Sequence, residues 1–173
     1  IVFETLKRIR EKHGHREFGK IAQKLLAIAL CRLSFELKER SVQDVDIEAV
    51  KGNLRYWIEA KTTDKDEVHI KEKDVGCLNQ CELLHGGITC YAILKVSLLS
   101  DWIIASSNNI KPGAVRIGKF STQRISPLND DINKVFPSIV KEFGEQILCA
   151  GKGKAQSVAD RFLEAEMNRR GWV

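Results

Sequence analysis

An acidic and a basic side chain stand two positions apart in a run that otherwise has the composition of a β-strand. The run is YWIEAKTT, residues 56–63, and the two side chains are Glu59 and Lys61. Side chains of a strand alternate between its two faces, so Glu59 and Lys61 share one face. A carboxylate can bind a cation, and a lysine beside it can orient water or stabilise charge developing on a phosphate. The spacing therefore directs both groups to one place.

A second carboxylate reaches the same face if the preceding segment forms a hairpin with this strand. The order DVDIEAV, KGN, LRYWIEAKTT predicts such a hairpin, with Asp46 in its first strand. A two-residue loop, such as Lys51-Gly52, pairs Asp46 with Trp57 and brings the carboxylate to the shared face. A three-residue loop turns Asp46 away, unless a bulge at Gly52 restores the register. The number of turn residues therefore decides whether two carboxylates meet.

Two carboxylates that meet on a sheet repel each other unless a cation lies between them, and Mg²⁺ prefers oxygen ligands. A bound divalent metal lowers the pKa of its bound water. It also reduces the electrostatic repulsion between a phosphodiester and the nucleophile that attacks it. Asp46, Glu59 and Lys61 are therefore suitable groups for phosphodiester hydrolysis. Asp44 and Glu48 lie on the Asp46 side of the first strand and are alternative ligands.

The elements that must position these groups alternate between helix and strand. Apolar periodicity predicts helices over 2–12, 16–33 and 71–87. The His-Gly-His turn at 13–15 separates the first two of these helices. Strands are expected within 33–42, 44–50, 54–63, 88–96 and 97–107, followed by a polar extended run to about 125. Closing helices are expected from about Pro137 to Leu148 and from a Ser157 N-cap to Gly171. This order predicts an α/β fold with a mixed β-sheet flanked by helices.

Length and composition fit one domain spanning residues 1–173, because the chain is 43% hydrophobic and short for two cores. No apolar run approaches the roughly 20 residues of a membrane span, and the start lacks a secretory pattern. We therefore expect no membrane association and a cytoplasmic location. The five cysteines are scattered and odd in number, which favours reduced thiols over a disulfide framework.

The net charge of +5 is unevenly distributed. Residues 36–74 hold 11 of the 23 acidic residues, whereas 102–129 contain none. Basic surfaces attract phosphate backbones, although such charges taken alone are more often ordinary solvated side chains. The candidate phosphate contacts in the acid-free stretch are Lys111, Arg116, Lys119 and Arg124.

The segment DVDIEAVKGNLRYWIEAKTT resembles the core of the PD-(D/E)xK nucleases, the superfamily of restriction endonucleases and Holliday junction resolvases. Asp46 matches the aspartate of that pattern, and Glu59-Ala60-Lys61 matches (D/E)xK. Val45 stands where the proline of the name would be. The resemblance covers roughly residues 16–105 as the catalytic core and leaves a C-terminal helical part, about 128–171, unmatched.

The resemblance implies roles for particular residues. Asp46 and Glu59 would bind Mg²⁺ or Mn²⁺, and Lys61 would activate or orient the attacking water. Glu17, in REFGKIAQKLLAIAL, corresponds to a glutamate that the family commonly has on the preceding helix, and would support the metal. A homodimer is compatible with this reading, since cutting both strands of a duplex commonly needs two active sites.

The sequence thus favours a Mg²⁺-dependent DNA endonuclease of restriction or repair and resolvase type. The alternative is a DNA-binding or assembly module of the same fold that does not cut. Two other motifs are weaker. Cys77 and His85 lie about 12 Å apart on one helix face, too far to share a zinc ion. AGKGKAQS, residues 150–157, lacks the spacing of a phosphate-binding loop.

Overall fold

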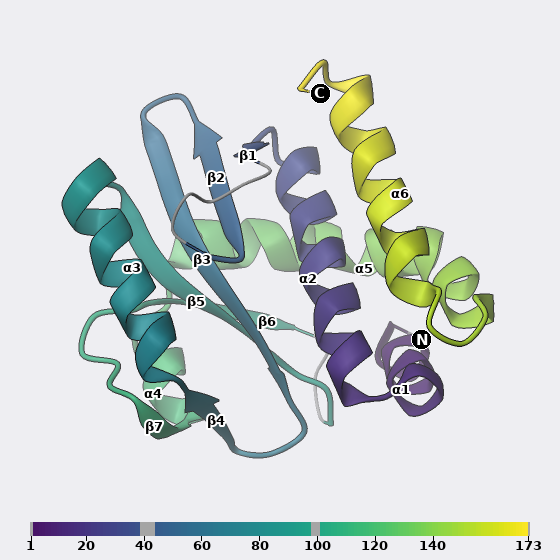
Figure 1. Ribbon diagram of the computed structural model, residues 1–173, viewed down its shortest axis with the longest axis horizontal. Coiled ribbons are helices and arrows are strands. Elements are labelled where there is room, and N and C mark those ends of the chain that lie inside the picture. The colour runs from purple at the N-terminus through teal and green to yellow at the C-terminus, as the bar shows by residue number, and fades with distance from the viewer. Residues whose placement is uncertain (1, 39–43, 98–100, 173) are drawn as a thin grey trace.

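The structure is a computed structural model, and it describes residues 2–38, 44–97 and 101–172. A five-stranded sheet lies at its centre, in the order β1-β2-β3-β5-β6 (Figure 1). These strands are β1 Glu36–Lys38, β2 Ile47–Lys51, β3 Leu54–Thr63, β5 Ile88–Lys95 and β6 Trp102–Ser106. The β3 and β5 strands are parallel and the other neighbours are antiparallel, which confirms the expected mixed sheet.

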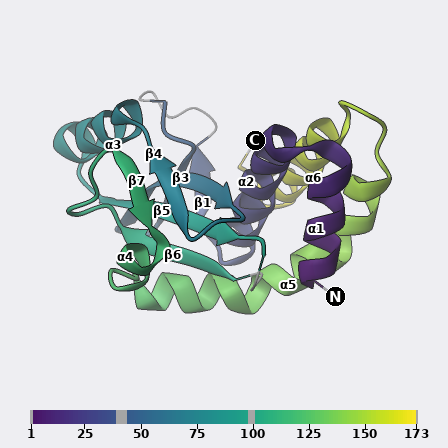
Figure 2. The ribbon, with the colours of Figure 1, turned by 90° about the horizontal axis from the view of Figure 1, so that it is seen from below.

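Helices cover both faces of this sheet (Figure 2). On one face lie α1 Val2–His13, α2 His15–Arg32, α5 Ser126–Cys149 and α6 Ala155–Arg169. On the other lie α3 Glu72–His85, α4 Ile117–Ser121 and a small two-stranded sheet of β4 Glu67–Ile70 and β7 Gly113–Arg116. The chain therefore has an α/β fold in which helices flank a mixed sheet.

Alternation along the central strands divides the apolar core between the two faces. On β3, Ile58 packs with the α2 layer, whereas Trp57 packs with the α3 layer. On β5, Ala92 and Ile93 divide in the same way. A strand covered on both faces needs apolar residues at every position, which explains the uninterrupted apolar run of β5.

Three expectations about the C-terminal half are wrong. The helix expected from Pro137 begins at Ser126 and contains Pro137 in its interior. Its apolar stripe, including buried Ile132 and Phe136, begins before Pro137, and this burial outweighs the hydrogen bond that proline removes. The polar run expected to be extended is a strand over Gly113–Arg116 and then continues as α4, because Phe120 is fully buried against Tyr91. The last helix is preceded by Lys154 and not by a Ser157 cap.

Among the helices that the structure describes, none is both long enough and apolar enough to cross a membrane.

Candidate active site

The hairpin turn contains two residues, Gly52 and Asn53, between the closing pair Lys51 and Leu54. Gly52 adopts a φ of +59°, a left-handed conformation that favours glycine. Of the two loop lengths that the sequence leaves open, the structure has the two-residue one, and it lies one residue later than Lys51-Gly52. The last paired residues are Ile47 and Ile58, so Asp46, the next residue outward, lies level with Glu59 and not with Trp57.

Asp46 lies at the bend just before β2 and is held there by two hydrogen bonds. The backbone N–H of Ala60 donates to Asp46 Oδ2 at 2.9 Å, and Gln23 Nε2 donates to the Asp46 carbonyl oxygen at 3.4 Å. Burial raises the pKa of Asp46, although the Ala60 N–H and the charge of Lys61 oppose this effect. The strand that carries Glu59 and Lys61 thus also orients the Asp46 carboxylate.

Glu59 is only 7% exposed, which is rare for a carboxylate. Burial, followed by the negative charge of Asp46, raises the pKa of Glu59 to about 7. Because the charge of Asp46 disfavours the ionisation of Glu59, the two carboxylates form a site that a cation or a proton would stabilise.

Lys61 lies between two carboxylates. Its Nζ is 3.3 Å from Glu59 Oε1 and 2.7 Å from Asp74 Oδ2, at the start of α3. Burial alone lowers the pKa of Lys61, but the hydrogen bond to Asp74 and the nearby negative charges outweigh it and raise the pKa. The ammonium group therefore stays charged inside the pocket. Asp74 was absent from the sequence candidates.

These residues line one polar pocket of about 560 Å³ between α2, β3 and α3. The pocket wall brings Asp46, Glu59, Lys61 and Asp74 together with several cations. The basic or potentially basic residues of the wall are His15, Arg16, Lys20, Lys71 and Lys73. A cation could bind at the acidic floor while a phosphate backbone contacts the basic rim.

The residues present fit a hard divalent metal. Half-buried Asp46 and buried Glu59 supply carboxylate oxygens, and Mg²⁺ commonly binds through one or two carboxylates while keeping several waters. In the described part of the chain, no three or more His, Cys, Asp and Glu residues gather closely enough to hold a metal by themselves. The donor set therefore suits a metal completed by water and a phosphate oxygen.

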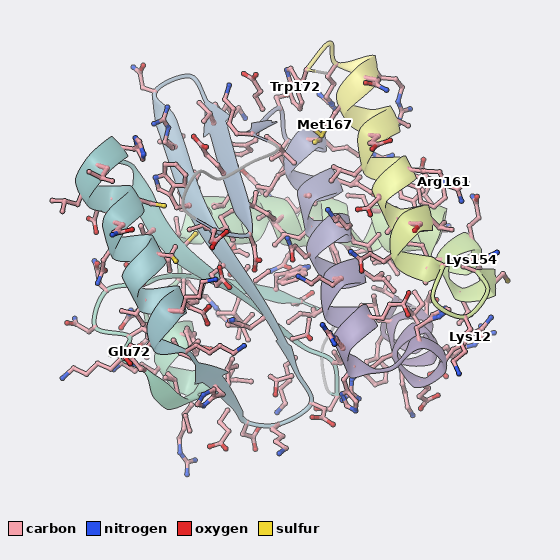
Figure 3. The ribbon with its side chains drawn as sticks, viewed as in Figure 1. Lys12, Glu72, Lys154, Arg161, Met167 and Trp172 are labelled. Atoms are coloured by element: carbon pink, nitrogen blue, oxygen red, sulfur yellow. The ribbon has the colours of Figure 1, made fainter. Side chains whose placement is uncertain are left out.

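Glu17 lies away from this pocket, contrary to the expectation that it supports the metal. Its Oε1 accepts a hydrogen bond from the Gln156 backbone N–H at 3.3 Å, and it lines a separate pocket with Lys12 and Lys152. In Figure 3 the labelled Lys12 marks the end of α1, and the labelled Lys154 marks the turn before α6. The α2 residues that do line the Asp46 pocket include Gly19, Lys20 and Gln23.

The four basic candidates of the acid-free stretch, Lys111, Arg116, Lys119 and Arg124, are exposed, and none of them lines the Asp46 pocket. Arg116 on β7 lies opposite Glu67 in the β4–β7 strand pairing. Glu67 lines a neighbouring pocket together with Lys61. Arg124 instead lines a pocket with Trp102 and Asn129. These residues therefore do not form one surface around the site.

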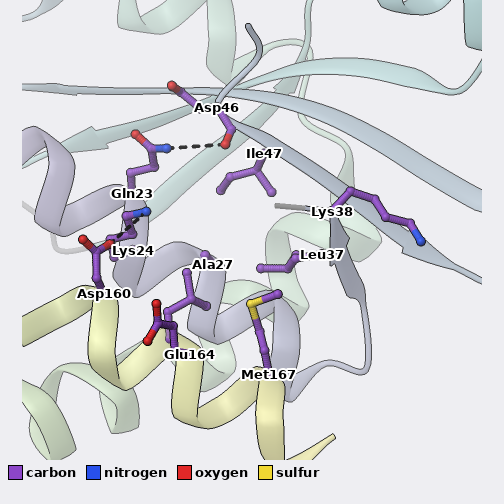
Figure 4. Close-up of a pocket in the computed structure, with 11 residues that line it drawn as sticks. Gln23, Lys24, Ala27, Leu37, Lys38, Asp46, Ile47, Asp160, Glu164 and Met167 are labelled. Atoms are coloured by element: carbon purple, nitrogen blue, oxygen red, sulfur yellow. Dashed lines mark hydrogen bonds and ion pairs between the residues drawn. The ribbon is translucent and has the colours of Figure 1, made fainter. Parts of the chain in front are cut away.

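A second pocket of about 240 Å³ lies on the other side of Asp46, between α2, α6 and the start of β2 (Figure 4). Gln23 and Asp46 line both this pocket and the pocket that contains Glu59 and Lys61. The hydrogen bond between Gln23 and Asp46 therefore lies where the two pockets meet. The Lys24 to Asp160 ion pair, at 3.0 Å, joins α2 to α6 at the edge of this pocket.

No protein-family model matches the sequence, and neither does any curated protein. Among solved structures, the chain is similar to Hjc, a Holliday junction resolvase from the archaeal hyperthermophile Archaeoglobus fulgidus. The TM-score is 0.50 at 15% sequence identity, and the match covers 64% of this chain and 97% of Hjc. The fold is restriction-endonuclease-like. The expected fold is thus confirmed. The likeness to the resolvase is a likeness of fold.

Proposed function

We propose that this protein is a divalent-metal-dependent DNA endonuclease of the resolvase type. The observation that carries the proposal is the pair of carboxylates, half-buried Asp46 and buried Glu59, that the β2–β3 hairpin presents beside Lys61. The likeness in fold to a Holliday junction resolvase supports DNA as the substrate.

Each residue has a separate task in this proposal. Asp46 and Glu59 hold Mg²⁺ or Mn²⁺, which supplies a more acidic bound water and neutralises charge on the phosphodiester. Lys61 orients the attacking water and stabilises negative charge on the phosphoryl oxygens. Cations of the pocket rim hold the flanking phosphates, and Lys111, Arg116, Lys119 and Arg124 remain proposed contacts farther along the DNA. Cutting two strands would use two copies of the chain, so a homodimer is part of the proposal.

The test is cleavage of supercoiled, linear and four-way-branched DNA with Mg²⁺, Mn²⁺ or EDTA. Wild type is compared with Asp46→Asn, Glu59→Gln and Lys61→Ala, and Asp66→Asn is the matched control because Asp66 is exposed and pairs with Lys95. We expect metal-dependent cleavage that falls on the order of 100-fold or more in the three site variants. Cleavage that is equal in all variants, or absent from wild type, contradicts the proposal.

A non-catalytic DNA-binding or assembly module is the second candidate. The position of Glu17 favours it, because α2 brings no carboxylate to the pocket. This alternative predicts that wild type binds DNA in a gel-shift assay but leaves every substrate intact in Mg²⁺ and in Mn²⁺.

A further inference from the structure

The α3 helix begins at the edge of the pocket, and its third residue contacts Lys61. The distance from Lys61 Nζ to Asp74 Oδ2 is 2.7 Å, compared with 3.3 Å to Glu59 Oε1. Charge-assisted hydrogen bonds of this length are the stronger ones in proteins. Asp74 is therefore the closer of the two partners of the ammonium group.

Asp74 is itself held in place by the start of its helix. Its Oδ2 also accepts a hydrogen bond from the backbone N–H of Lys71 at 3.2 Å, which satisfies one of the free N–H groups there. A negative charge in the first turn of a helix is further stabilised by the helix dipole. Only 12% of the Asp74 side chain is exposed. The carboxylate is thus a fixed anchor for the ammonium group.

The contacts of Asp74 distinguish it from the proposed metal ligands. One oxygen, Oδ2, faces both the Lys61 ammonium and the Lys71 N–H. Within residues 2–38, 44–97 and 101–172, no third His, Cys, Asp or Glu joins a close pair to make a metal cluster. Asp74 therefore acts on Lys61, whose ammonium group contacts Asp74 on one side and Glu59 on the other.

Without this anchor, Glu59 is the carboxylate that Lys61 still contacts within the described part of the chain. An ammonium group that moved fully onto Glu59 would neutralise the oxygen that the metal needs. We propose that Asp74 is a positioning residue that holds the Lys61 ammonium at the reacting side of the pocket and away from Glu59. This inference rests on the proposed endonuclease function and assigns that function a fourth side chain.

A double-mutant cycle tests whether Asp74 acts through Lys61. Asp74→Asn keeps an oxygen that can accept from the Lys71 N–H but removes the charge, and Asp74→Glu restores the charge. We expect Asp74→Asn to lower kcat about tenfold or more with little change in KM, and to have less than about a twofold effect in a Lys61→Ala background. Single-turnover rates at excess enzyme measure the slow variants.

Glu72→Gln is the matched control, because Glu72 is an exposed acid in the same first turn of α3, labelled in Figure 3. It should cleave at the wild-type rate, and Asp74→Glu should recover part of the lost rate. Circular dichroism checks that each variant is folded. An unchanged rate in Asp74→Asn, or an equal loss with and without Lys61, overturns the inference while the endonuclease function stands.

A second measurement needs no cleavage. Acylation of lysines in the metal-free protein, read by mass spectrometry, reports how firmly each ammonium is held. We expect Asp74→Asn to raise labelling of Lys61 several-fold relative to exposed Lys65 in the same molecule, and Glu72→Gln to leave the ratio unchanged. An unchanged ratio in Asp74→Asn overturns the anchoring role. If wild type cuts no DNA but the ratio rises, the proposed function fails, whereas the anchoring of Lys61 by Asp74 is supported.

Discussion

The backbone N–H of Ala60 donates a hydrogen bond to Asp46 Oδ2, and Ala60 is the residue between Glu59 and Lys61. The first carboxylate is thus oriented by the backbone of the strand that carries the other two groups. Because the turn has two residues, this contact follows from the hairpin register itself. The acid, acid and lysine arrangement is a property of one hairpin, completed by α2 and α3.

Asp46→Asn should raise the free energy of unfolding of the metal-free protein at pH 8. The substitution removes a charge whose buried position raises its pKa, and the amide oxygen can still accept from Ala60. Asp46→Ala loses that acceptor and should gain less. Urea unfolding in EDTA, followed by tryptophan fluorescence, measures the difference. Lower stability in Asp46→Asn than in wild type would contradict the prediction.

The stability of the metal-free protein should fall as the pH rises through the titration of Glu59. Its folded pKa is about 7 against an ordinary value of 4.5, so the folded state binds this proton more tightly than the unfolded state does. Unfolding free energy therefore decreases between about pH 4.5 and 7, by up to about 3 kcal/mol, and Glu59 adds no further change above that range. Glu59→Gln should flatten this decrease. Urea midpoints at pH 5, 6, 7 and 8 in EDTA provide the test, and parallel curves for the two proteins would refute it.

Two adjacent glycines after α3 should respond differently to alanine. Gly87 has a φ of +95°, and an added Cβ would lie 2.9 Å from the Arg55 carbonyl oxygen. Gly86 has a φ of +66° with nothing within 4 Å. We expect Gly86→Ala to cost about 1 kcal/mol and Gly87→Ala more than about 2 kcal/mol, because only the second adds a backbone clash to the left-handed strain. Equal losses in urea unfolding would show that the close approach to Arg55 is relieved cheaply.

DNA binding should depend more on Arg16 than on Arg124. Arg16 lines the pocket with Asp46, whereas Arg124 lines a separate one. Each lost phosphate contact reduces the slope of log K against log salt concentration by about 0.9 for duplex DNA. We therefore expect Arg16→Ala to reduce the slope by about that amount and Arg124→Ala by less. Fluorescence anisotropy with Ca²⁺ in place of Mg²⁺ measures both, and the reverse order would move the DNA path towards the β6–α5 side.

The sequence predicted the fold and the hairpin because both depend on local patterns. Alternation in β3 assigned Glu59 and Lys61 to one face, and the parity of the turn brought Asp46 to it. The pairing partner was misplaced because KGN allows a two-residue loop at either of two positions. Such a shift moves the register by two residues and leaves the face unchanged.

The residues that helices bring to the site could not be predicted in the same way. The apolar face of α2 is broad, so periodicity does not reveal which polar residues border the pocket. The resemblance pointed to Glu17, whereas Gln23 is the residue that lines the pocket. Asp74 is one of many acids in an acidic segment. Its contact with Lys61 follows from the placement of the α3 start against β3, a tertiary contact that no local pattern records.

Trp57 lies two residues before Glu59 on the same face of β3, and its indole N–H donates to the Gly86 carbonyl oxygen at 2.8 Å. One side chain thus connects the hairpin, the end of α3 and the face that carries the acidic pair. A change in the separation of hairpin and helix would alter the indole environment. The protein therefore contains an optical reporter of its own site, and emission from Trp57, isolated by replacing Trp102 and Trp172, could follow events in the pocket without an added label.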